Sequence, residues 1–283
     1  MNNADAIFSH ARSAPERIAL RDSAGASWTY ATLRDRVAAV AARLAHQGVR
    51  RGDRVLLIAP SVPEFAAAYY GIHAAGAIAV TANTMAPAPE LEYLASDAGV
   101  ALVLGWPSIG RPPEAAAAAL GVPYQPLTPD LLDGPGVSEP YRVEADDTAT
   151  ILYTSGTTGR PKGAQLTHGN LIACADVFVK AHQITPEDRG GTALPLFHIY
   201  GQACVMGTAL RAGASLSLLE RFEPRAMYEM LQRDRLTFVA GVPTMWNALL
   251  RADLPDFSGL RYASSGGASL PAEVMRAFHE RFG

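Results

Sequence analysis

The sequence has few cysteines and no strong excess of charge of either sign. Two cysteines, Cys174 and Cys204, occur in 283 residues, too few for a disulfide framework or a cysteine-ligated metal cluster. The formal net charge is −3, without long runs of one sign, which argues against a nucleic-acid-binding arm. The first ten residues lack the basic end and apolar stretch of a secretion signal. We therefore expect reduced thiols and a cytoplasmic protein that binds no nucleic acid.

Long uninterrupted hydrophobic runs are also missing. Residues 65–89 and 190–210 contain no Asp, Glu, Lys or Arg, so both need to be considered as membrane spans. Each is interrupted by polar residues and helix breakers, which include His73, Gly76, Asn83, Pro195, His198, Gly201 and Gln202. A membrane-spanning helix needs about 20 consecutive apolar residues. The two segments therefore predict buried helices and strands, and no transmembrane segment.

Short apolar runs alternate with patterns of helical spacing along the chain. The expected strands cover residues 17–21, 27–30, 55–59, 78–81, 100–104, 151–154, 214–219, 236–240 and 260–264. The expected helices cover residues 33–44, 64–75, 89–97, 170–182, 224–233, 244–251 and 271–282. Such alternation is typical of an α/β fold with mostly parallel sheets flanked by helices.

Domain organisation is indicated by one segment rich in breakers and by the last helix. Residues 133–147 contain two glycines and two prolines, which predicts a linker between halves 1–140 and 146–283. The last helical pattern runs into Gly283, where a parallel α/β fold would continue with a strand. We therefore expect 1–283 to be one amino-terminal domain that is incomplete at its carboxy-terminal end.

The strongest chemical signal is the string TSGTTGRPKG at residues 154–163, directly after an expected strand. Its glycines let the backbone turn tightly and point N–H groups inward. Four hydroxyl groups and Lys162 can donate to phosphate oxygens, as polyphosphate binding requires. The common P-loop instead needs Gly-Lys-Ser/Thr opening a helix, whereas Pro161 precedes Lys162 here. The alternative interpretation is a surface turn that binds nothing.

The segment 153–163 resembles the phosphate-loop signature of the adenylate-forming superfamily, which includes acyl- and aryl-CoA synthetases, luciferases and nonribosomal peptide synthetase adenylation domains. Residues 194–201, LPLFHIYG, resemble the second signature of the fatty acyl- and aryl-CoA ligases. Residues 265–270, SGGASL, resemble the start of the adenosine-binding signature, and 241–245, GVPTM, resemble a segment that lines the acyl pocket. The resemblance covers essentially the whole chain and favours an acyl-CoA synthetase.

The resemblance implies ATP-dependent activation of a small-molecule carboxylic acid. The carboxylate attacks the α-phosphate of ATP, pyrophosphate leaves, and the thiol of CoA takes the acyl group from the resulting acyl-adenylate. The resemblance assigns the β- and γ-phosphates to Thr154, Ser155, Gly156, Thr157, Thr158, Gly159 and Lys162. Mg²⁺ would share the phosphate charge, with Thr154 as its protein ligand, and Lys162 and His198 would be the catalytic residues.

The remaining site residues also follow from the resemblance. Gly266, Gly267 and Ala268 would let the backbone approach adenine, although a plain strand-to-helix turn is the alternative. The substrate pocket would contain His198, Tyr200, Gly241 and Trp246. His198 would lie near the reacting carboxylate, against the alternative of a buried histidine bonded to a backbone carbonyl, and Trp246 could equally belong to the core. A general base is unnecessary, because a fatty acid is already ionised at pH 7.

The sequence also departs from the family pattern. Amino-acid-activating relatives carry an aspartate in the second signature, whereas residues 197–200 read FHIY, so an uncharged fatty or aryl acid is favoured. The sequence has no Tyr-Gly-x-Thr-Glu with its Mg²⁺-binding glutamate, no ribose-binding Thr-Gly-Asp, and no small carboxy-terminal domain with a catalytic lysine. We therefore expect this chain alone to turn over poorly or not at all. The alternatives are an adenylating module that loads an acyl carrier protein, and a non-catalytic nucleotide- or acyl-binding module.

Overall fold

The computed structural model describes residues 1–154 and 160–282. The chain divides into two compact units, each made of segments that are separate in sequence. Unit 1 contains residues 1–16, 30–60 and 64–174, and unit 2 contains residues 17–29, 61–63 and 175–283. Residues 133–147, predicted to link two halves, lie wholly inside unit 1. The predicted halves therefore differ from the two units in both boundary and content.

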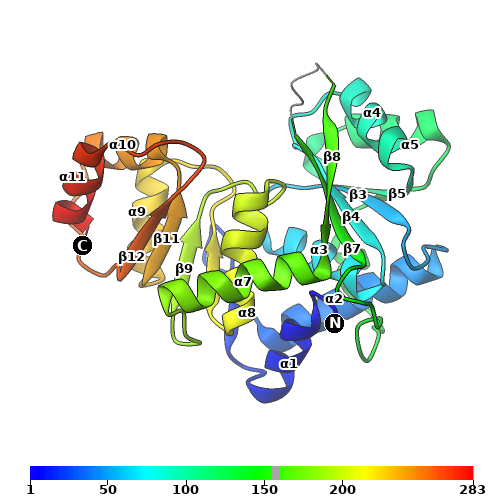
Figure 1. Ribbon diagram of the computed structural model, residues 1–283, viewed down its shortest axis with the longest axis horizontal. Coiled ribbons are helices and arrows are strands. Elements are labelled where there is room, and N and C mark those ends of the chain that lie inside the picture. Colours follow the sequence, from blue (N-terminus) through cyan, green and yellow to red (C-terminus); the bar gives the residue numbers. More distant parts are fainter. Residues whose placement is uncertain (155–159, 283) are drawn as a thin grey trace. The chain divides into compact units, whose positions relative to one another are not determined.

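Unit 1 is built on a six-stranded sheet in the order β6-β5-β3-β4-β7-β8 (Figure 1). Its strands are β3 (Arg54–Ile58), β4 (Ile78–Thr81), β5 (Val100–Gly105), β6 (Tyr124–Pro126), β7 (Thr148–Thr154) and β8 (Lys162–Thr167). All neighbouring pairs are parallel except β7 with β8. The sequence correctly predicted the parallel strands β3, β4, β5 and β7, because strands covered on both faces read as continuous apolar runs.

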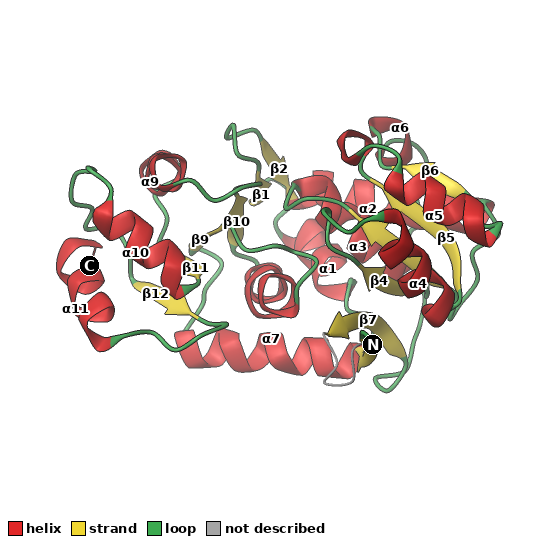
Figure 2. Cartoon of the chain, turned by 90° about the horizontal axis from the view of Figure 1, so that it is seen from above, coloured by secondary structure: helices red, strands yellow, loops and turns green. Residues whose placement is uncertain are grey.

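Helices cover the sheet of unit 1. They are α1 (Asp5–Ser13), α2 (Tyr30–His46), α3 (Pro63–Ala74), α4 (Ala88–Ala98), α5 (Pro112–Leu120), α6 (Pro129–Leu132) and the 3₁₀ turn η1 (Pro107–Ile109). One hydrophobic cluster packs α4 and α5 against the sheet through Leu91, Leu94 and Ala116 from the helices and Leu56 and Val103 from the strands. Figure 2 shows α4 and α5 lying along the sheet beside β5. This packing gives α4 a fixed position on the sheet.

Two buried histidines hold the amino-terminal residues of unit 1. The backbone N–H of Asn3 donates to Nδ1 of His168 at 3.0 Å, and the Asn3 amide nitrogen lies 3.3 Å from Nδ1 of His73. The two imidazole rings are 5.3 Å apart. Burial lowers the pKa of His168 to about 4 and lowers the pKa of His73 well below its usual value, with a further contribution from the neighbouring His168. Both side chains are therefore neutral at pH 7.

Unit 2 is built on a second six-stranded sheet, ordered β12-β11-β9-β10-β1-β2. Its strands are β1 (Ile18–Arg21), β2 (Ser27–Thr29), β9 (Arg189–Thr192), β10 (Ser215–Leu218), β11 (Phe238–Gly241) and β12 (Tyr262–Ser265). The predicted strands 17–21 and 27–30 are confirmed and form a hairpin, with β2 antiparallel to β1, while the other neighbours are parallel. The helical segments are α7 (His168–His182, which begins in unit 1), the π-helix η2 (Tyr200–Gly207), α8 (Thr208–Ala212), α9 (Pro224–Arg233), α10 (Pro243–Arg251) and α11 (Ala272–Phe282).

The strand β9 was not predicted from the sequence, because glycines occupy its centre. A Cβ atom at Gly190 would lie 2.2 Å from the Phe238 ring, and one at Gly191 would lie 2.2 Å from Leu236. Side chains of the neighbouring chain segment therefore lie directly across β9. The same glycines that this packing requires remove the β-branched and aromatic residues by which a strand is normally predicted.

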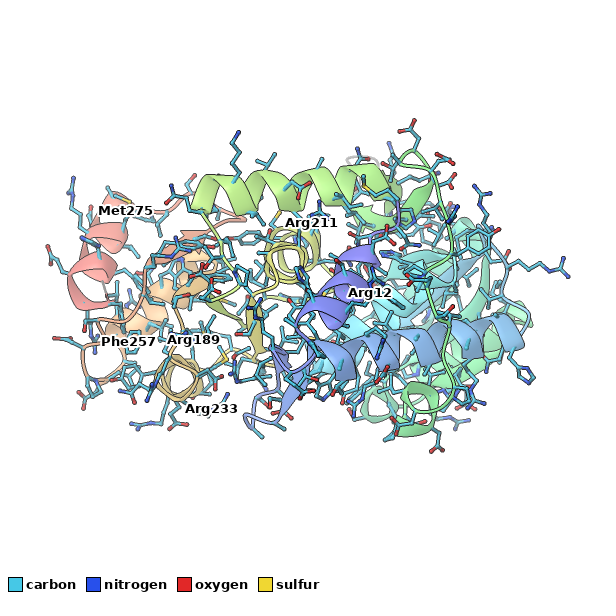
Figure 3. All side chains as sticks on the ribbon, turned by 90° about the horizontal axis from the view of Figure 1, so that it is seen from below. Arg12, Arg189, Arg211, Arg233, Phe257 and Met275 are labelled. Atoms are coloured by element: carbon cyan, nitrogen blue, oxygen red, sulfur yellow. The ribbon has the colours of Figure 1, made fainter. Side chains whose placement is uncertain are left out.

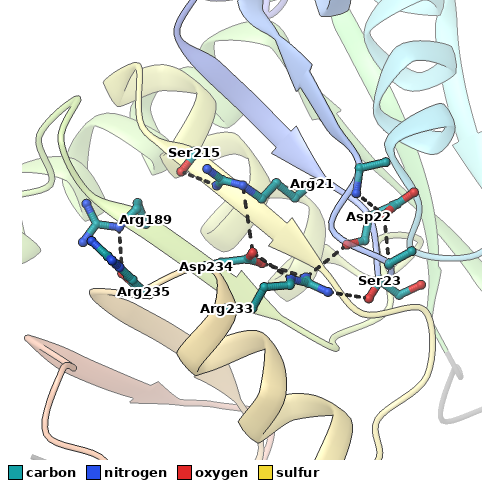
Figure 4. A network of polar contacts seen from close by, with 10 residues as sticks. Arg21, Asp22, Ser23, Arg189, Ser215, Arg233, Asp234 and Arg235 are labelled. Atoms are coloured by element: carbon teal, nitrogen blue, oxygen red, sulfur yellow. Dashed lines mark hydrogen bonds and ion pairs between the residues drawn. The ribbon is translucent and has the colours of Figure 1, made fainter.

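Ion pairs tie the β1–β2 hairpin to α9 (Figure 4). The Asp234 carboxylate is buried and pairs with Arg21 at 4.0 Å and Arg233 at 2.8 Å. Arg233 also donates to the backbone oxygens of Ser23 at 2.8 Å and Asp22 at 3.4 Å. Because one guanidinium serves both the carboxylate and the turn, the hairpin and the end of α9 are held together.

One ion pair of unit 2 joins two helices at the surface. Arg211 of α8, labelled in Figure 3, pairs with Asp176 of α7 at 2.6 Å. Both side chains are more than a third exposed. Exposed pairs of this kind contribute little to stability. Within the described part of the chain, none of the helices combines the length and apolar character that a bilayer crossing requires.

We predict that acid destabilises unit 1 through His168. A folded-state pKa of about 4, below the usual 6.5, means that the unfolded chain binds the proton more tightly. The free energy of unfolding should therefore fall as the pH is lowered from about 6.5 to about 4, by about 3 kcal/mol for this one group. Urea unfolding at a series of pH values should show a smaller decrease for His168→Gln than for the wild type. His46→Gln, at an exposed position of α2, is the matched control and should keep the wild-type slope; an unchanged slope in His168→Gln would contradict the prediction.

Candidate functional site

The glycine- and hydroxyl-rich segment connects β7 to β8 of unit 1. Thr154 is the last residue of β7, Lys162 is the first residue of β8, and the two are partners in the antiparallel register. Ser155, Gly156, Thr157, Thr158 and Gly159, which were predicted to bind phosphate, lie outside the described residues. Lys162, expected within the loop, instead begins a strand. The hairpin thus brings an exposed hydroxyl and an exposed ammonium group together.

A glycine is needed at the next position of this hairpin. A Cβ atom at Gly163 would lie 2.9 Å from Ile151 and 3.2 Å from the ring of Tyr153. Both neighbours are on β7, so the side chains of β7 cover the backbone of β8 immediately after Lys162. A larger residue at Gly163 would push the two strands apart where Lys162 and Thr154 face each other.

In unit 2 the predicted residues gather at the carboxyl ends of three neighbouring parallel strands. Gly241 is the last residue of β11, Gly266 follows β12, and the segment with His198 and Tyr200 follows β9. The backbone N–H of Gly266 donates to the carbonyl oxygen of Gly241 at 3.1 Å. Ligands of open α/β sheets bind outside the carboxyl ends of the strands. The segments predicted to hold substrate and adenine therefore lie where this fold class places a ligand.

Tyr200 is fixed at this edge by β12. Its hydroxyl lies 2.6 Å from Oγ of Ser264, and a Cβ atom at Gly266 would lie 2.8 Å from its ring. The ring therefore covers the backbone of Gly266 in the space that a side chain would need. Burial raises the pKa of the Tyr200 phenol. The phenol is consequently a neutral hydrogen-bonding group throughout the physiological pH range.

His198 is exposed, so the alternative of a buried histidine is wrong. Its Nδ1 accepts a hydrogen bond from the backbone N–H of Tyr200 at 3.3 Å. In a neutral imidazole whose Nδ1 accepts, the proton is on Nε2. The side chain therefore offers an N–H donor at the carboxyl end of the sheet.

The π-helix η2 (Tyr200–Gly207) begins two residues after His198. A Cβ atom at Gly201 would lie 2.5 Å from the carbonyl oxygen of Pro195, so only glycine lets the helix start so close to the preceding turn. Such segments occur frequently at functional sites. The sequence did not indicate a π-helix here, because over eight residues the spacing of apolar side chains does not distinguish a π-helix from an α-helix.

Gly241 and Trp246 are in contact, and Trp246 has two roles. A Cβ atom at Gly241 would lie 2.8 Å from the Trp246 ring. Trp246 is buried in the core and packs edge-on against Phe278 with ring centroids 5.0 Å apart. It also lines a cavity of about 430 Å³, together with residues of β12, of α11 and of the segment between them, among them Tyr262 and Leu270. The core assignment of Trp246 is thus confirmed, and its place in a substrate pocket stays a prediction.

The predicted adenine segment follows β12 and is open to solvent. Gly267 has φ +76°, in the left-handed region that favours glycine, and both Gly267 and Ala268 are exposed. The Oγ of Ser265, next to them, is buried without a hydrogen-bond partner among the described residues. Nowhere in residues 1–154 and 160–282 do three or more His, Cys, Asp or Glu side chains form a group able to hold a metal ion.

Comparison with known proteins gives a consistent result over the whole chain. The family model described as AMP-binding enzyme matches residues 7–283. The chain is 36% identical over 277 residues to a feruloyl-CoA synthase from Amycolatopsis sp, covering 96% of this chain and 55% of that protein. It is 32% identical over 248 residues to the long-chain-fatty-acid–CoA ligase FadD13 of Mycobacterium tuberculosis, covering 82% and 48%. The chain thus spans about half the length of the curated relatives it matches.

Solved structures share the fold. ATP-bound MatB from Rhodopseudomonas palustris superposes with a TM-score of 0.89 at 30% identity, covering 100% of this chain and 58% of that one. An inhibitor-bound N-terminal domain of FACL13 from Mycobacterium tuberculosis gives a TM-score of 0.87 at 27% identity, covering 99% and 73%. The α/β fold class and the predicted family resemblance are therefore confirmed.

We predict that Gly266→Ala destabilises unit 2 through the Tyr200 ring. The added methyl group would displace the ring and weaken its bond to Ser264, lowering the free energy of unfolding by about 1–3 kcal/mol, as overpacking typically does. Urea unfolding should show this loss to be smaller in a Tyr200→Ala background, where the space is open. Gly207→Ala is the matched control, since its Cβ would meet only the Gln202 oxygen at 3.5 Å. An equal loss in both backgrounds would contradict the steric explanation.

Proposed function

Because the chain belongs to the AMP-binding enzyme family, we propose that it carries the nucleotide-binding part of an enzyme that activates a carboxylic acid with ATP. The carboxylate would attack the α-phosphate, pyrophosphate would leave, and the acyl group of the acyl-adenylate would pass to the thiol of CoA. The observation that supports this most directly is the hairpin register that pairs Thr154 with Lys162 across the segment TSGTTGRPK. A positive charge and a hydroxyl on either side of a donor-rich turn suit a polyphosphate.

Lys162 would stabilise the negative charge of the phosphates with its ammonium group. Displacement at phosphorus is catalysed chiefly by holding the phosphates in place and stabilising their charge. An exposed ammonium at the start of a strand can approach the β- and γ-phosphates while its backbone stays fixed by the ladder with β7. Together with Ser155, Gly156, Thr157, Thr158 and Gly159, it would bind the departing pyrophosphate.

Mg²⁺ would be held mainly by the nucleotide. Mg²⁺ prefers oxygen ligands and is commonly bound through one or two protein groups together with substrate phosphates. Thr154 presents an exposed hydroxyl, a suitable oxygen ligand. When bound, the ion would reduce the negative charge that repels an approaching carboxylate.

His198 and Tyr200 would contact the acid. The Nε2–H that the Tyr200 backbone contact assigns to His198 is a donor suited to a carboxylate oxygen. Tyr200, bonded to Ser264, would form a wall of the pocket, with Gly241 and Trp246 further along it. Gly266, Gly267 and Ala268 would receive adenine on their backbone. No proton needs to be removed from the acid, since it is already ionised.

An uncharged fatty or aryl acid is the proposed substrate class. The segment FHIY at 197–200 contains no acidic residue that could pair with a substrate amine. The relatives at 36% and 32% identity are named for feruloyl and long-chain fatty acyl groups, and both for CoA as the acceptor. This supports CoA rather than an acyl carrier protein as the acceptor. Since the chain spans about half of these relatives, we expect it alone to bind ATP but to support little pyrophosphate exchange.

We predict that Lys162→Ala weakens ATP binding in the presence of Mg²⁺ by about 10- to 100-fold, as expected for loss of a charged hydrogen bond. Isothermal titration calorimetry with the 283-residue chain measures this directly. Lys180, on an exposed part of α7, is the only other lysine in the sequence, so Lys180→Ala is the matched control. ATP should also protect Lys162, and not Lys180, from an amine-acylating reagent read by mass spectrometry.

Three outcomes would overturn parts of this proposal. Absence of ATP binding by the wild-type chain would contradict the nucleotide assignment. ATP–pyrophosphate exchange assayed with short to long fatty acids, aryl acids and amino acids tests the rest: strong exchange would show that the chain is sufficient for adenylation and would name the substrate class. Exchange confined to amino acids would contradict the proposed class.

A further inference from the structure

Two tyrosine hydroxyl groups connect the β7–β8 hairpin to helix α4 of unit 1. The hydroxyl of Tyr93, on α4, donates to the carbonyl oxygen of Pro161 at 2.9 Å. The hydroxyl of Tyr153, on β7, donates to Oδ2 of Asp97 on α4 at 2.6 Å. The end of β7 and the residue directly before β8 are therefore both bonded to the same helix.

The two contacts are made by one face of α4. Tyr93 and Asp97 are four residues apart, so their side chains lie one above the other on the helix. The neighbouring face carries Leu91, Leu94 and Ala95, which are buried in the core of unit 1. A helix that buries one face and bonds the hairpin with another transmits the rigidity of the core to the hairpin.

The end of α4 is fixed to the sheet as well. Arg54, the first residue of β3, donates from Nε to the carbonyl oxygen of Ala98 at 2.7 Å, and its guanidinium also bonds the carbonyl oxygen of Gly99. A cation at the carboxyl end of a helix also interacts favourably with the helix dipole. Tyr93 and Asp97 thus project from a helix that is held both along its length and at its end.

The Tyr93 contact lies next to the proposed phosphate-binding lysine. The carbonyl of Pro161 belongs to the peptide unit whose nitrogen is that of Lys162, and a peptide unit is planar. A hydrogen bond to this oxygen therefore fixes the orientation of the peptide plane that contains the nitrogen and Cα atoms of Lys162. The proline ring also fixes φ of Pro161, so the rotation about its Cα–C bond is the only soft backbone dihedral angle within that residue. Few soft dihedral angles remain between α4 and the Cα atom of Lys162.

We propose that Tyr93 is a positioning residue for phosphate binding, whose hydroxyl orients Lys162 through the carbonyl of Pro161. This inference rests on the proposed function of Lys162 and extends it to a residue of α4. Packing of Tyr93 against Tyr153 needs only its aromatic ring, whose centroid lies 6.4 Å from that of Tyr153 at an interplanar angle of 71°. The hydroxyl group is an addition to that packing, and its acceptor is the one carbonyl that adjoins Lys162.

The test removes the hydroxyl and keeps the ring. Tyr93→Phe is compared with the wild-type chain for binding of ATP with Mg²⁺, inorganic tripolyphosphate and adenosine by calorimetry. Loss of one neutral hydrogen bond that orients a charge should weaken ATP and tripolyphosphate binding by about three- to tenfold. Adenosine binding should stay within about twofold, because adenosine has no phosphate for Lys162 to contact.

The matched control is Tyr69→Phe. Tyr69 is a buried tyrosine of α3 whose hydroxyl lies 2.9 Å from Oγ1 of Thr150. Its variant also loses a hydroxyl hydrogen bond in unit 1, and should lower the melting temperature without changing the ratio of ATP affinity to adenosine affinity. A second variant, Lys162→Ala combined with Tyr93→Phe, should bind ATP no more weakly than Lys162→Ala alone, because the hydroxyl acts through the lysine.

The outcomes separate this inference from the proposed function. If the wild-type chain binds neither ATP nor tripolyphosphate, the assignment of Lys162 fails and the role of Tyr93 fails with it. If the wild type binds both and Tyr93→Phe binds all three ligands as well, the hydroxyl has no positioning role. Equal weakening of all three ligands would also overturn the inference, since it would indicate a general loss of folded structure.

Discussion

The packing of unit 2 depends on large side chains that occupy the space where a glycine has no Cβ atom. Phe238 of β11 lies across Gly190 of β9, and Leu236 lies across Gly191. At the carboxyl ends of the strands the same arrangement recurs, with the Trp246 ring against Gly241 and the Tyr200 ring against Gly266. Each of these contacts is too close for any residue with a Cβ atom, so the positions of large side chains at the core and at the candidate site are set by where glycine stands.

The glycine contacts of β9 also allow a row of stacked aromatic rings in unit 2. Because Gly190 leaves room for Phe238, that ring can stack on Tyr262 of β12 at 5.2 Å, and Tyr262 stacks in turn on His182 at the end of α7 at 4.6 Å. Nearby, Arg261 pairs with the buried Asp188 at 2.9 Å. The order of β9, β11 and β12 is therefore fixed by packing of aromatic groups as well as by backbone hydrogen bonds. The candidate site lies at the other end of these strands, so the same strand order places its residues.

Much of the fold could be predicted from the sequence, because most elements bury an apolar stripe or run. The expected β4 and α9 coincide with the observed Ile78–Thr81 and Pro224–Arg233. Two of the missed strands share a cause. The strand β9 is glycine-rich, and β8 starts inside the string that was interpreted as a loop, so their side chains carry no strand-like pattern. Their strand conformation is imposed by neighbouring strands, which a single sequence does not identify.

The candidate site was predicted residue by residue, while its supporting contacts were not. The sequence indicated Lys162, His198, Tyr200 and Gly266 through motifs. The partners that hold them, such as Ser264 for Tyr200 or Tyr93 for Pro161, are more than 60 residues away along the chain. Proximity of that kind arises only when strands and helices pack, and nothing in the spacing of one sequence reports it.

Because of the π-helix after His198, the number of residues in this segment determines the direction of its side chains. A π-helix closes its hydrogen bonds over one more residue than an α-helix, so Tyr200–Gly207 accommodates a residue that an α-helix of the same reach would not. Removing one residue would let the segment close as an α-helix and would turn the side chains on one side of the deletion by about 100° relative to those on the other. When homologous chains are aligned here, a single-residue gap should therefore be interpreted as a change in the direction of side chains, and not as a shortened loop.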